Sequence, residues 1–172
     1  DSLPVMTTLG VTTLISDSGV TRYRVNTEEW MMYDRKKPSY WAFEKGVYME
    51  QFDSIFNVEA SIKADTAYYY DKERLWKLIG NVDIQNRKGE RFNTELLYWN
   101  EATQKVYSDK FIRIQQPDRI ITGHGFDSNQ QMTIYTIRNI EGIFYVDEEA
   151  SGGPPQPETK ALPDSVNKDT AK

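Results

Sequence analysis

The stretch FNVEASIKADTAYYY, residues 56–70, decides the fold of this chain. Its side chains alternate in kind one by one, and the mainly apolar series is Phe56, Val58, Ala60, Ile62, Ala64, Thr66 and Tyr68. A period of two places each series on one face of a β-strand, whereas an amphipathic helix repeats its apolar residues every three or four positions. No window shows helical spacing cleanly, although residues 26–33 would also fit a single helical turn. The stretch therefore predicts a long strand with one buried face.

The same alternation continues along the rest of the chain. It recurs in residues 76–84, 92–98, 106–114 and 120–126, and a weaker series contains Ile134, Ile140 and Phe144. Short turns rich in Asp, Asn, Gly and Pro separate these runs. Long strands joined by short turns form antiparallel hairpins with one apolar face, and such faces meet in a barrel or a jelly-roll-like sandwich. We therefore expect an all-β, antiparallel fold.

Composition excludes several classes of protein. The net charge of −5 and the lack of a basic stripe argue against nucleic acid as a partner. The chain has no cysteine, which excludes disulfides, zinc–thiolate sites and thiol catalysis. No apolar run is long enough to span a membrane. Because the chain begins with Asp1, we expect a mature or trimmed form that has lost a signal or anchor.

The carboxy-terminal residues differ in character from the rest. Residues 148–172 contain Gly152–Gly153–Pro154–Pro155, Pro157 and Pro163 and few large apolar side chains. Such a segment buries too little apolar surface to offset the entropy lost on ordering. We expect one folded domain in residues 1–147, followed by a flexible tail in residues 148–172.

Residues with catalytic potential do not form a recognisable constellation. His124 is the single histidine, and a surface or hydrogen-bonded structural role is the simpler interpretation. The carboxyl pairs Asp65/Glu59 and Glu28/Glu29 fall on the polar face, which favours solvation over a glycosidase pair. Tyr68–Tyr69–Tyr70 fits a strand end better than a carbohydrate platform. We therefore expect no catalytic residue, no metal site, no cofactor and no enzymatic activity.

An internal repeat connects the strands in pairs. Asn93–Thr94–Glu95 precedes Leu96–Leu97–Tyr98–Trp99, just as Asn26–Thr27–Glu28 precedes Trp30–Met31–Met32–Tyr33. A return half with a central glycine follows, as in Ile79–Gly80–Asn81–Val82. Copies recur roughly 29 to 37 residues apart, and two strands per repeat build a sheet that lengthens with copy number.

Two units of this repeat carry a family resemblance. They read ADTAYYYDKERLWKLIGNV at residues 64–82 and GERFNTELLYWNEATQKVYSD at residues 89–109. The pattern resembles the LptC family of periplasmic lipopolysaccharide export proteins and the wider LptA/OstA-like repeat, over about residues 20–146. The chain departs from the family in lacking an amino-terminal membrane anchor and in its weaker unit at residues 120–146.

The resemblance implies a fold, a function and partners. The fold is a long-stranded, twisted, open β-jelly roll with a V-shaped apolar interior. The function is a relay that takes lipopolysaccharide from the inner-membrane ABC transporter, at the amino-terminal edge, and passes it to an LptA-like bridge protein at the carboxy-terminal edge. The location is the periplasm, with an anchor in the inner membrane supplied by a segment absent from this chain.

The inward series of the strands supplies the candidate lipid-contacting residues. They are Phe56, Val58, Ile62, Trp76, Leu78, Val82, Ile84, Phe92, Leu96, Ile112, Ile114, Phe126, Ile134 and Phe144. The same residues would equally pack a closed core. A structural or adhesive β-repeat module without a lipid ligand therefore remains the alternative, and an open apolar groove would distinguish the two.

Overall fold

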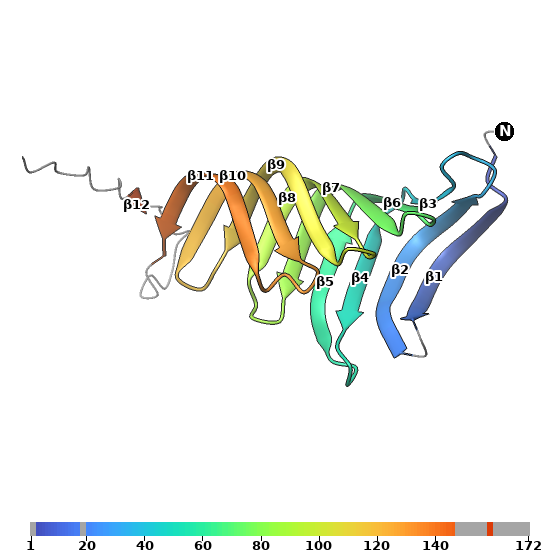
Figure 1. Ribbon diagram of the computed structural model, residues 1–172, viewed down its shortest axis with the longest axis horizontal. Helices are drawn as coiled ribbons and strands as arrows, with labels where there is room; N and C mark the ends of the chain where they lie inside the picture. Colours follow the sequence, from blue (N-terminus) through green and yellow to red (C-terminus); the bar gives the residue numbers. More distant parts are fainter. Residues whose placement is uncertain (1–2, 18–19, 147–157, 160–172) are drawn as a thin grey trace, which may run out of the picture.

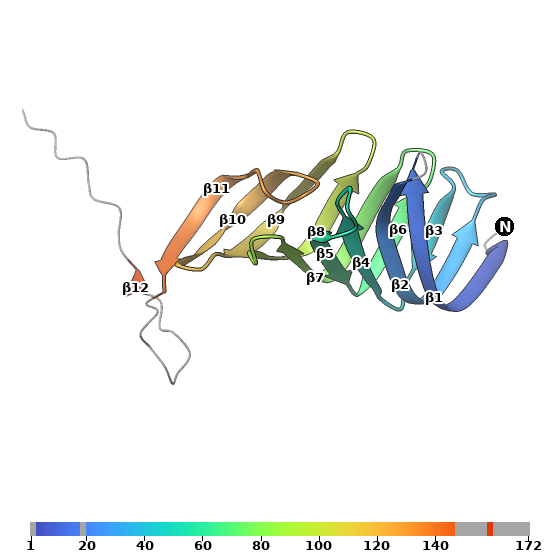
Figure 2. The same ribbon diagram turned by 90° about the horizontal axis from the view of Figure 1, so that it is seen from below.

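The computed structural model describes residues 3–17, 20–146 and 158–159, and these form an elongated β-sheet structure (Figures 1 and 2). The strands are β1 (Met6–Asp17), β2 (Val20–Tyr33), β3 (Tyr40–Phe43), β4 (Val47–Phe52), β5 (Val58–Ala64), β6 (Thr66–Tyr70), β7 (Leu75–Asn86), β8 (Arg91–Asn100), β9 (Lys105–Gln115), β10 (Arg119–Asn129), β11 (Tyr135–Tyr145) and β12 (Glu158–Thr159). All strand pairings are antiparallel within one 12-stranded sheet. The predicted all-β jelly-roll-like fold is confirmed, and residues 26–33 lie in β2 rather than in a helical turn.

The sheet is folded lengthwise into two walls, because the long strands bend near their middle. In two places a pair of short strands takes the position of one long strand. The long strand β2 pairs with both β3 and β4, and the long strand β7 pairs with both β5 and β6. The first wall consists of β3, β6 and residues 6–9, 29–33, 75–79, 96–100, 105–108, 126–129 and 135–138. The second wall consists of β4, β5 and residues 11–17, 20–27, 82–86, 91–94, 111–115, 119–123 and 140–145.

The bends have identifiable backbone causes. In β7, Gly80 and Asn81 have φ values of 82° and 45°, and the register with β8 shifts at this point. Asp65, in the gap between β5 and β6, donates its amide to the Gly80 carbonyl (2.9 Å) and accepts the Asn81 side-chain amide (2.8 Å). In β10, Gly125 has a φ of 82° at another register shift. Positive φ is readily adopted by glycine and tolerated by asparagine, so these residue types allow the folded sheet.

On some strands the bend also shifts by one position which residues face the core. On β8, Phe92 and Thr94 are buried before the bend, and Leu97 and Trp99 are buried after it. The sequence pattern continued from Thr94 to Leu96 and Tyr98, and this continuation is wrong. Leu96 is half-buried and faces outward, because the β8–β9 register shifts between Thr94 and Tyr98.

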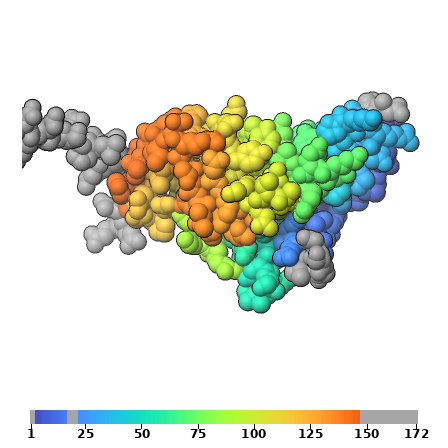
Figure 3. Space-filling view, viewed as in Figure 1, coloured from blue at the N-terminus to red at the C-terminus, as the bar shows by residue number. Residues whose placement is uncertain are grey.

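The core fills the space between the walls. Trp76, Leu78, Val82, Ile84 and Phe92 are at most 1% exposed. The space-filling view shows side chains of β8 to β11 forming a continuous surface on one face, while the β4–β5 turn projects from the rim (Figure 3). Burial decreases toward the two ends of the body. At the amino-terminal end the inward residues of the first wall are only partly buried, and at the carboxy-terminal end the inward residues of the second wall are only partly buried. Examples are Trp30, Trp41, Ile121 and Ile143.

Candidate functional site

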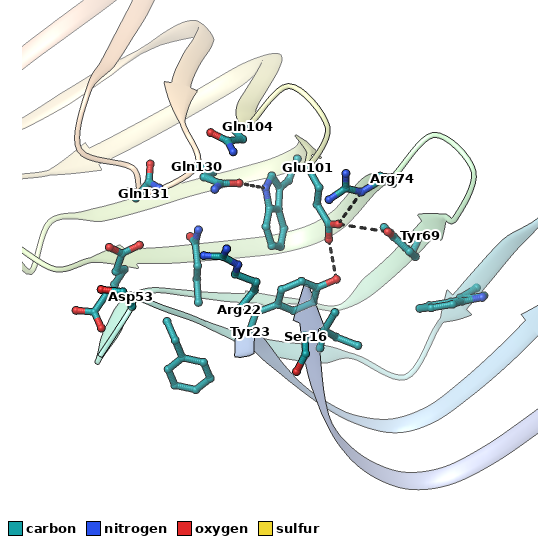
Figure 4. A pocket seen from close by; sticks show the side chains of 17 residues that line it. Ser16, Arg22, Tyr23, Asp53, Tyr69, Arg74, Glu101, Gln104, Gln130 and Gln131 are labelled. Carbon is teal, nitrogen blue, oxygen red and sulfur yellow. Dashed lines mark hydrogen bonds and ion pairs between the residues drawn. The ribbon is translucent and has the colours of Figure 1, made fainter. Parts of the chain in front are cut away.

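A cavity of about 480 Å³ opens between the rims of the two walls, and 17 residues line it (Figure 4). The second wall contributes the ends of β1, β2 and β4 and the start of β5. The first wall contributes β3, β6, the end of β8 and the turns that follow β6, β8 and β10. The lining residues are Ile15, Ser16, Arg22, Tyr23, Trp41, Gln51, Phe52, Asp53, Ser54, Glu59, Tyr69, Arg74, Trp99, Glu101, Gln104, Gln130 and Gln131. We call this space the mouth cavity.

Aromatic side chains form the inner part of the mouth cavity. The rings of Tyr23 and Trp99 meet edge to face at 5.3 Å, and Trp41 and Tyr69 lie 4.9 Å apart. Trp76 continues the cluster behind them, with its ring 4.7 Å from Tyr69. These contacts combine large apolar area with specific ring geometry, so the inner part of the cavity is an aromatic cluster.

A carboxylate lies at the centre of this aromatic group. Glu101 accepts hydrogen bonds from Tyr23 Oη (2.7 Å), Trp76 Nε1 (2.9 Å) and Tyr69 Oη (3.3 Å), and the Arg74 guanidinium lies 3.7 Å away. Burial, reinforced by the neighbouring Glu101 carboxylate, raises the pKa of both Tyr23 and Tyr69, so both hydroxyls stay protonated donors. Tyr23 belongs to the second wall and the other groups to the first, so the Glu101 cluster joins the two rims.

A second set of hydrogen bonds joins the rims further along the body. The Asn86 side chain donates to the Met132 carbonyl (2.9 Å), and Tyr135 Oη donates to Glu90 Oε2 (2.5 Å). Gln116 Nε2 donates to the same tyrosine oxygen at 2.6 Å. Burial and the bond to Glu90 raise the pKa of Tyr135 to about 12. The rims therefore meet directly over the carboxy-terminal half of the core.

The architecture agrees with a comparison against known families. A family described as lipopolysaccharide-assembly, LptC-related, matches residues 11–142, which run from β1 to β11 and include both walls. The chain belongs to this LptC family. The resemblance of its two central repeat units is thereby confirmed, and the role it implies is lipopolysaccharide transport by a periplasmic protein. No curated protein matches the chain.

Most of the predicted lipid-contacting residues lie in the filled part of this LptC-family core. Ile62 is 7% exposed, and the others in this group are at most 1% exposed: Trp76, Leu78, Val82, Ile84, Phe92, Ile112, Ile114 and Phe126. They share the inward faces of the two walls, as the alternation predicts. None of them belongs to the described lining of the mouth cavity. In this closed arrangement they are core residues, and contact with lipid would require the walls to separate.

The remaining predicted residues lie away from the core. Phe56 and Val58 are 50% and 44% exposed beside the β4–β5 turn, where Phe56 stacks on Phe52 at 4.3 Å. Ile134 is 76% exposed in the β10–β11 turn. Phe144 faces outward with its strand partner Ile120, because the next residue, Ile121, packs against the core. With Leu96, these residues do not converge on one groove.

Four of the five aromatic residues that line the mouth cavity were missed by the sequence analysis, and the fifth, Tyr69, was considered there as part of a carbohydrate platform and assigned to a strand end. Tyr23, Trp41, Phe52, Tyr69 and Trp99 lie on or beside the ends of strands, so a pattern that marks strand interiors passes over them. The available signal was the concentration of Trp and Tyr next to predicted turns. A one-dimensional pattern does not indicate which strand ends of the two walls face each other.

Other residues considered for chemistry have local partners in this LptC-family structure. His124 is exposed, contacts the Glu141 carboxylate and lies edge to face with Phe111 at 5.5 Å. Glu29 pairs with Lys45 at 3.1 Å, and the Tyr68 hydroxyl donates to Glu44 at 3.1 Å. Among residues 3–17, 20–146 and 158–159, no group of three or more acidic or histidine side chains is arranged to hold a metal ion. The same part of the chain contains no helix that would reach across a bilayer.

The predicted tail, residues 148–172, lies largely outside the described residues. Within it, Glu158 and Thr159 form β12, which pairs with Tyr145 and Phe144 at the edge of the second wall.

Proposed function

We propose that this chain is a lipopolysaccharide relay, which accepts the lipid from an inner-membrane ABC transporter and passes it to a periplasmic β-jelly-roll bridge protein. The observation that carries the proposal is the folded sheet itself, which has an aromatic mouth and only partly buried inward residues at both ends. A lipid moving along such an interior stays against apolar surface while its sugar head remains in water.

The hydrophobic effect sets the need for this architecture. Each methylene group removed from water contributes about 0.8 kcal/mol, so an acyl chain of ten methylenes gains roughly 8 kcal/mol from shelter. Weak, non-directional contacts with aliphatic and aromatic side chains provide that shelter without holding the lipid at one place. Because the middle of the core is filled, passage requires the two walls to separate, which exposes the buried candidate residues such as Ile84 and Ile112.

The sheet edges suit the proposed partners. The edge of β1 away from β2 and most of the outer edge of β11 have no strand partner among the described residues, since β12 covers only Phe144 and Tyr145. An unpaired edge accepts a further strand through main-chain hydrogen bonds. In the proposal the transporter binds the amino-terminal edge and the bridge protein binds the carboxy-terminal edge. The chain then lies in the periplasm and is anchored to the inner membrane. Pull-down from membranes tests these partners.

Site-specific photo-crosslinking tests the lipid ligand. A photoreactive residue at Phe52, Trp41 or Ile143 is expected to form an adduct with lipopolysaccharide in cells that run the export system. Matched outward positions are Lys77 and Asp83, which share β7 with the core residues but are half-buried on its outer face, where Asp83 pairs with Arg91. Equal labelling at inward and outward positions would refute the lipid relay.

The filled middle of the core favours one alternative, a structural or adhesive β-repeat module without a lipid ligand. It predicts no adduct at any inward position. Crosslinking at Ile112, deep between the walls, therefore separates the two functions most sharply, because only a chain whose walls part for lipid would be labelled there.

A further inference from the structure

The outer part of the mouth cavity is formed by glutamines. Gln51 lies near the end of β4, Gln104 in the β8–β9 turn, and Gln130 and Gln131 in the β10–β11 turn, and all four line the same cavity (Figure 4). They come from both walls and from segments far apart in the sequence. Their convergence is a property of the folded sheet, and no strand pattern in the sequence requires it.

These glutamines do not suit a hydrocarbon ligand. Each amide offers one acceptor oxygen and two N–H donors, and an acyl chain packed against it would remove water without replacing its hydrogen bonds. Leaving a polar group desolvated and unpaired is unfavourable. The inner part of the mouth cavity, by contrast, is aromatic. A ligand that matches both parts has apolar faces and a periphery of groups that both donate and accept hydrogen bonds.

A sugar ring has this combination. Its C–H groups pack on aromatic faces, and its hydroxyls pair with amides. One amide is already oriented: Trp99 Nε1 donates to Gln130 Oε1 at 3.4 Å, which directs the amide nitrogen of Gln130 to the other side. The cavity volume of about 480 Å³ is within the range of small-molecule sites, about 300–1,000 Å³.

The charges around the cavity favour a neutral ring over an isolated anion. Arg74 is beside Glu101 at 3.7 Å, and Asp53 is paired with Arg87 at 2.6 Å. Arg22 and Glu59 also line the space, so the lining holds three carboxylates, Asp53, Glu59 and Glu101, and two guanidinium groups, Arg22 and Arg74. Because the carboxylates outnumber the guanidinium groups, the cavity is not a cationic pocket of the kind that binds phosphate.

We propose that the mouth cavity is a carbohydrate subsite, which holds sugar of the glycolipid head group against its aromatic lining, of which Trp41 is the partly exposed member, with Gln51, Gln104, Gln130 and Gln131 as hydrogen-bonding partners. The inference rests on the proposed lipid relay and adds the part of the ligand that the rim recognises. The acyl chains then enter between the walls while the head stays at the rim.

The test uses deacylated lipopolysaccharide, which keeps the sugars and lacks the acyl chains. In protein with ¹⁵N-labelled glutamine side chains, the probe is expected to shift the amide signals of the four cavity glutamines and to leave those of Gln85 and Gln115 unchanged. These two are exposed on β7 and β9 and are internal controls. The double variant Gln51→Ala/Gln131→Ala is expected to weaken binding at least about tenfold, equivalent to 1.4 kcal/mol, and Gln85→Ala/Gln115→Ala to leave it unchanged.

Two results would overturn the subsite: absence of any shift, or equal shifts at cavity and control glutamines. The crosslinking experiment with intact lipopolysaccharide is read separately. Adducts at inward positions without saccharide shifts would leave the relay standing and remove the subsite. Saccharide shifts without adducts would keep the carbohydrate site and remove the relay.

Discussion

The adjacent leucines Leu96 and Leu97 provide the sharpest test of the bent strand β8. Leu97 is fully buried, and Leu96 is half-buried on the opposite face. Leu97→Ala removes three carbons from a closed core, which costs roughly 2.4 kcal/mol in transfer free energy at about 0.8 kcal/mol per methylene. The residual cavity adds to this, so we expect a total loss of about 3–5 kcal/mol of unfolding free energy. Leu96→Ala is expected to cost about 1 kcal/mol.

Urea unfolding followed by tryptophan fluorescence measures both variants, since Trp76 and Trp99 lie in the same core. With a slope of about 2 kcal/mol per molar urea, Leu97→Ala shifts the midpoint down by roughly 1.5–2.5 M and Leu96→Ala by about 0.5 M. Both variants make the same chemical change at adjacent positions of one strand, so each is the control for the other. Equal losses, or a larger loss at Leu96, would mean that β8 continues straight and that the inward series is 92, 94, 96 and 98.

Three further predictions concern the rims and the bends. Tyr23→Phe keeps the ring but removes the 2.7 Å hydrogen bond to Glu101, and it is expected to lower the unfolding free energy by about 1.5–3 kcal/mol, measured by urea titration; a loss no larger than that of an exposed tyrosine would contradict the role of the Glu101 cluster. The pKa of Tyr135 is about 12 and that of Tyr23 is also raised, so both hydroxyls keep their protons in the folded state at a pH where unfolded tyrosines, with a pKa near 10, lose theirs. The free energy of unfolding is therefore expected to fall as pH rises from about 10 to 12, and unfolding curves at several pH values check this sign. Gly80→Ala places a Cβ 3.0 Å from Asp65 Oδ2 at a φ of 82°, and we expect a loss of about 1–3 kcal/mol in thermal or urea unfolding, whereas unchanged stability would show that the bend tolerates another conformation.

The sequence was sufficient for the fold because the pleat imposes a strict period of two. On β5 and β7 the predicted inward residues Ile62, Trp76, Leu78 and Ile84 are buried, since a strand with one wet face has little freedom to place them elsewhere. The internal repeat also indicated the family correctly. These successes depend on interactions between neighbours in sequence or between adjacent strands.

The site was less predictable because it depends on distances across the folded sheet. The bend changes the face of the later residues on β8, as at Leu96, although no glycine marks it there. On β7 the buried series Trp76, Leu78, Val82 and Ile84 continues on the same face across Gly80. The mouth cavity requires Tyr23 and Glu101 to meet although they are 78 residues apart. Such a contact follows from how far the walls fold toward each other, which no local pattern specifies.

The bonds between neighbouring bends have a mechanical consequence for the middle of the sheet. Neighbouring bends are bonded to one another, as Asp65 is to Gly80 and Asn81, and Asn81 N to Glu95 Oε2 at 3.2 Å. One strand therefore resists rotating about its bend unless the adjacent strands rotate too. A force that opens the angle between the walls at β7 is therefore shared with the bends beside it, at Asp65 and on β8.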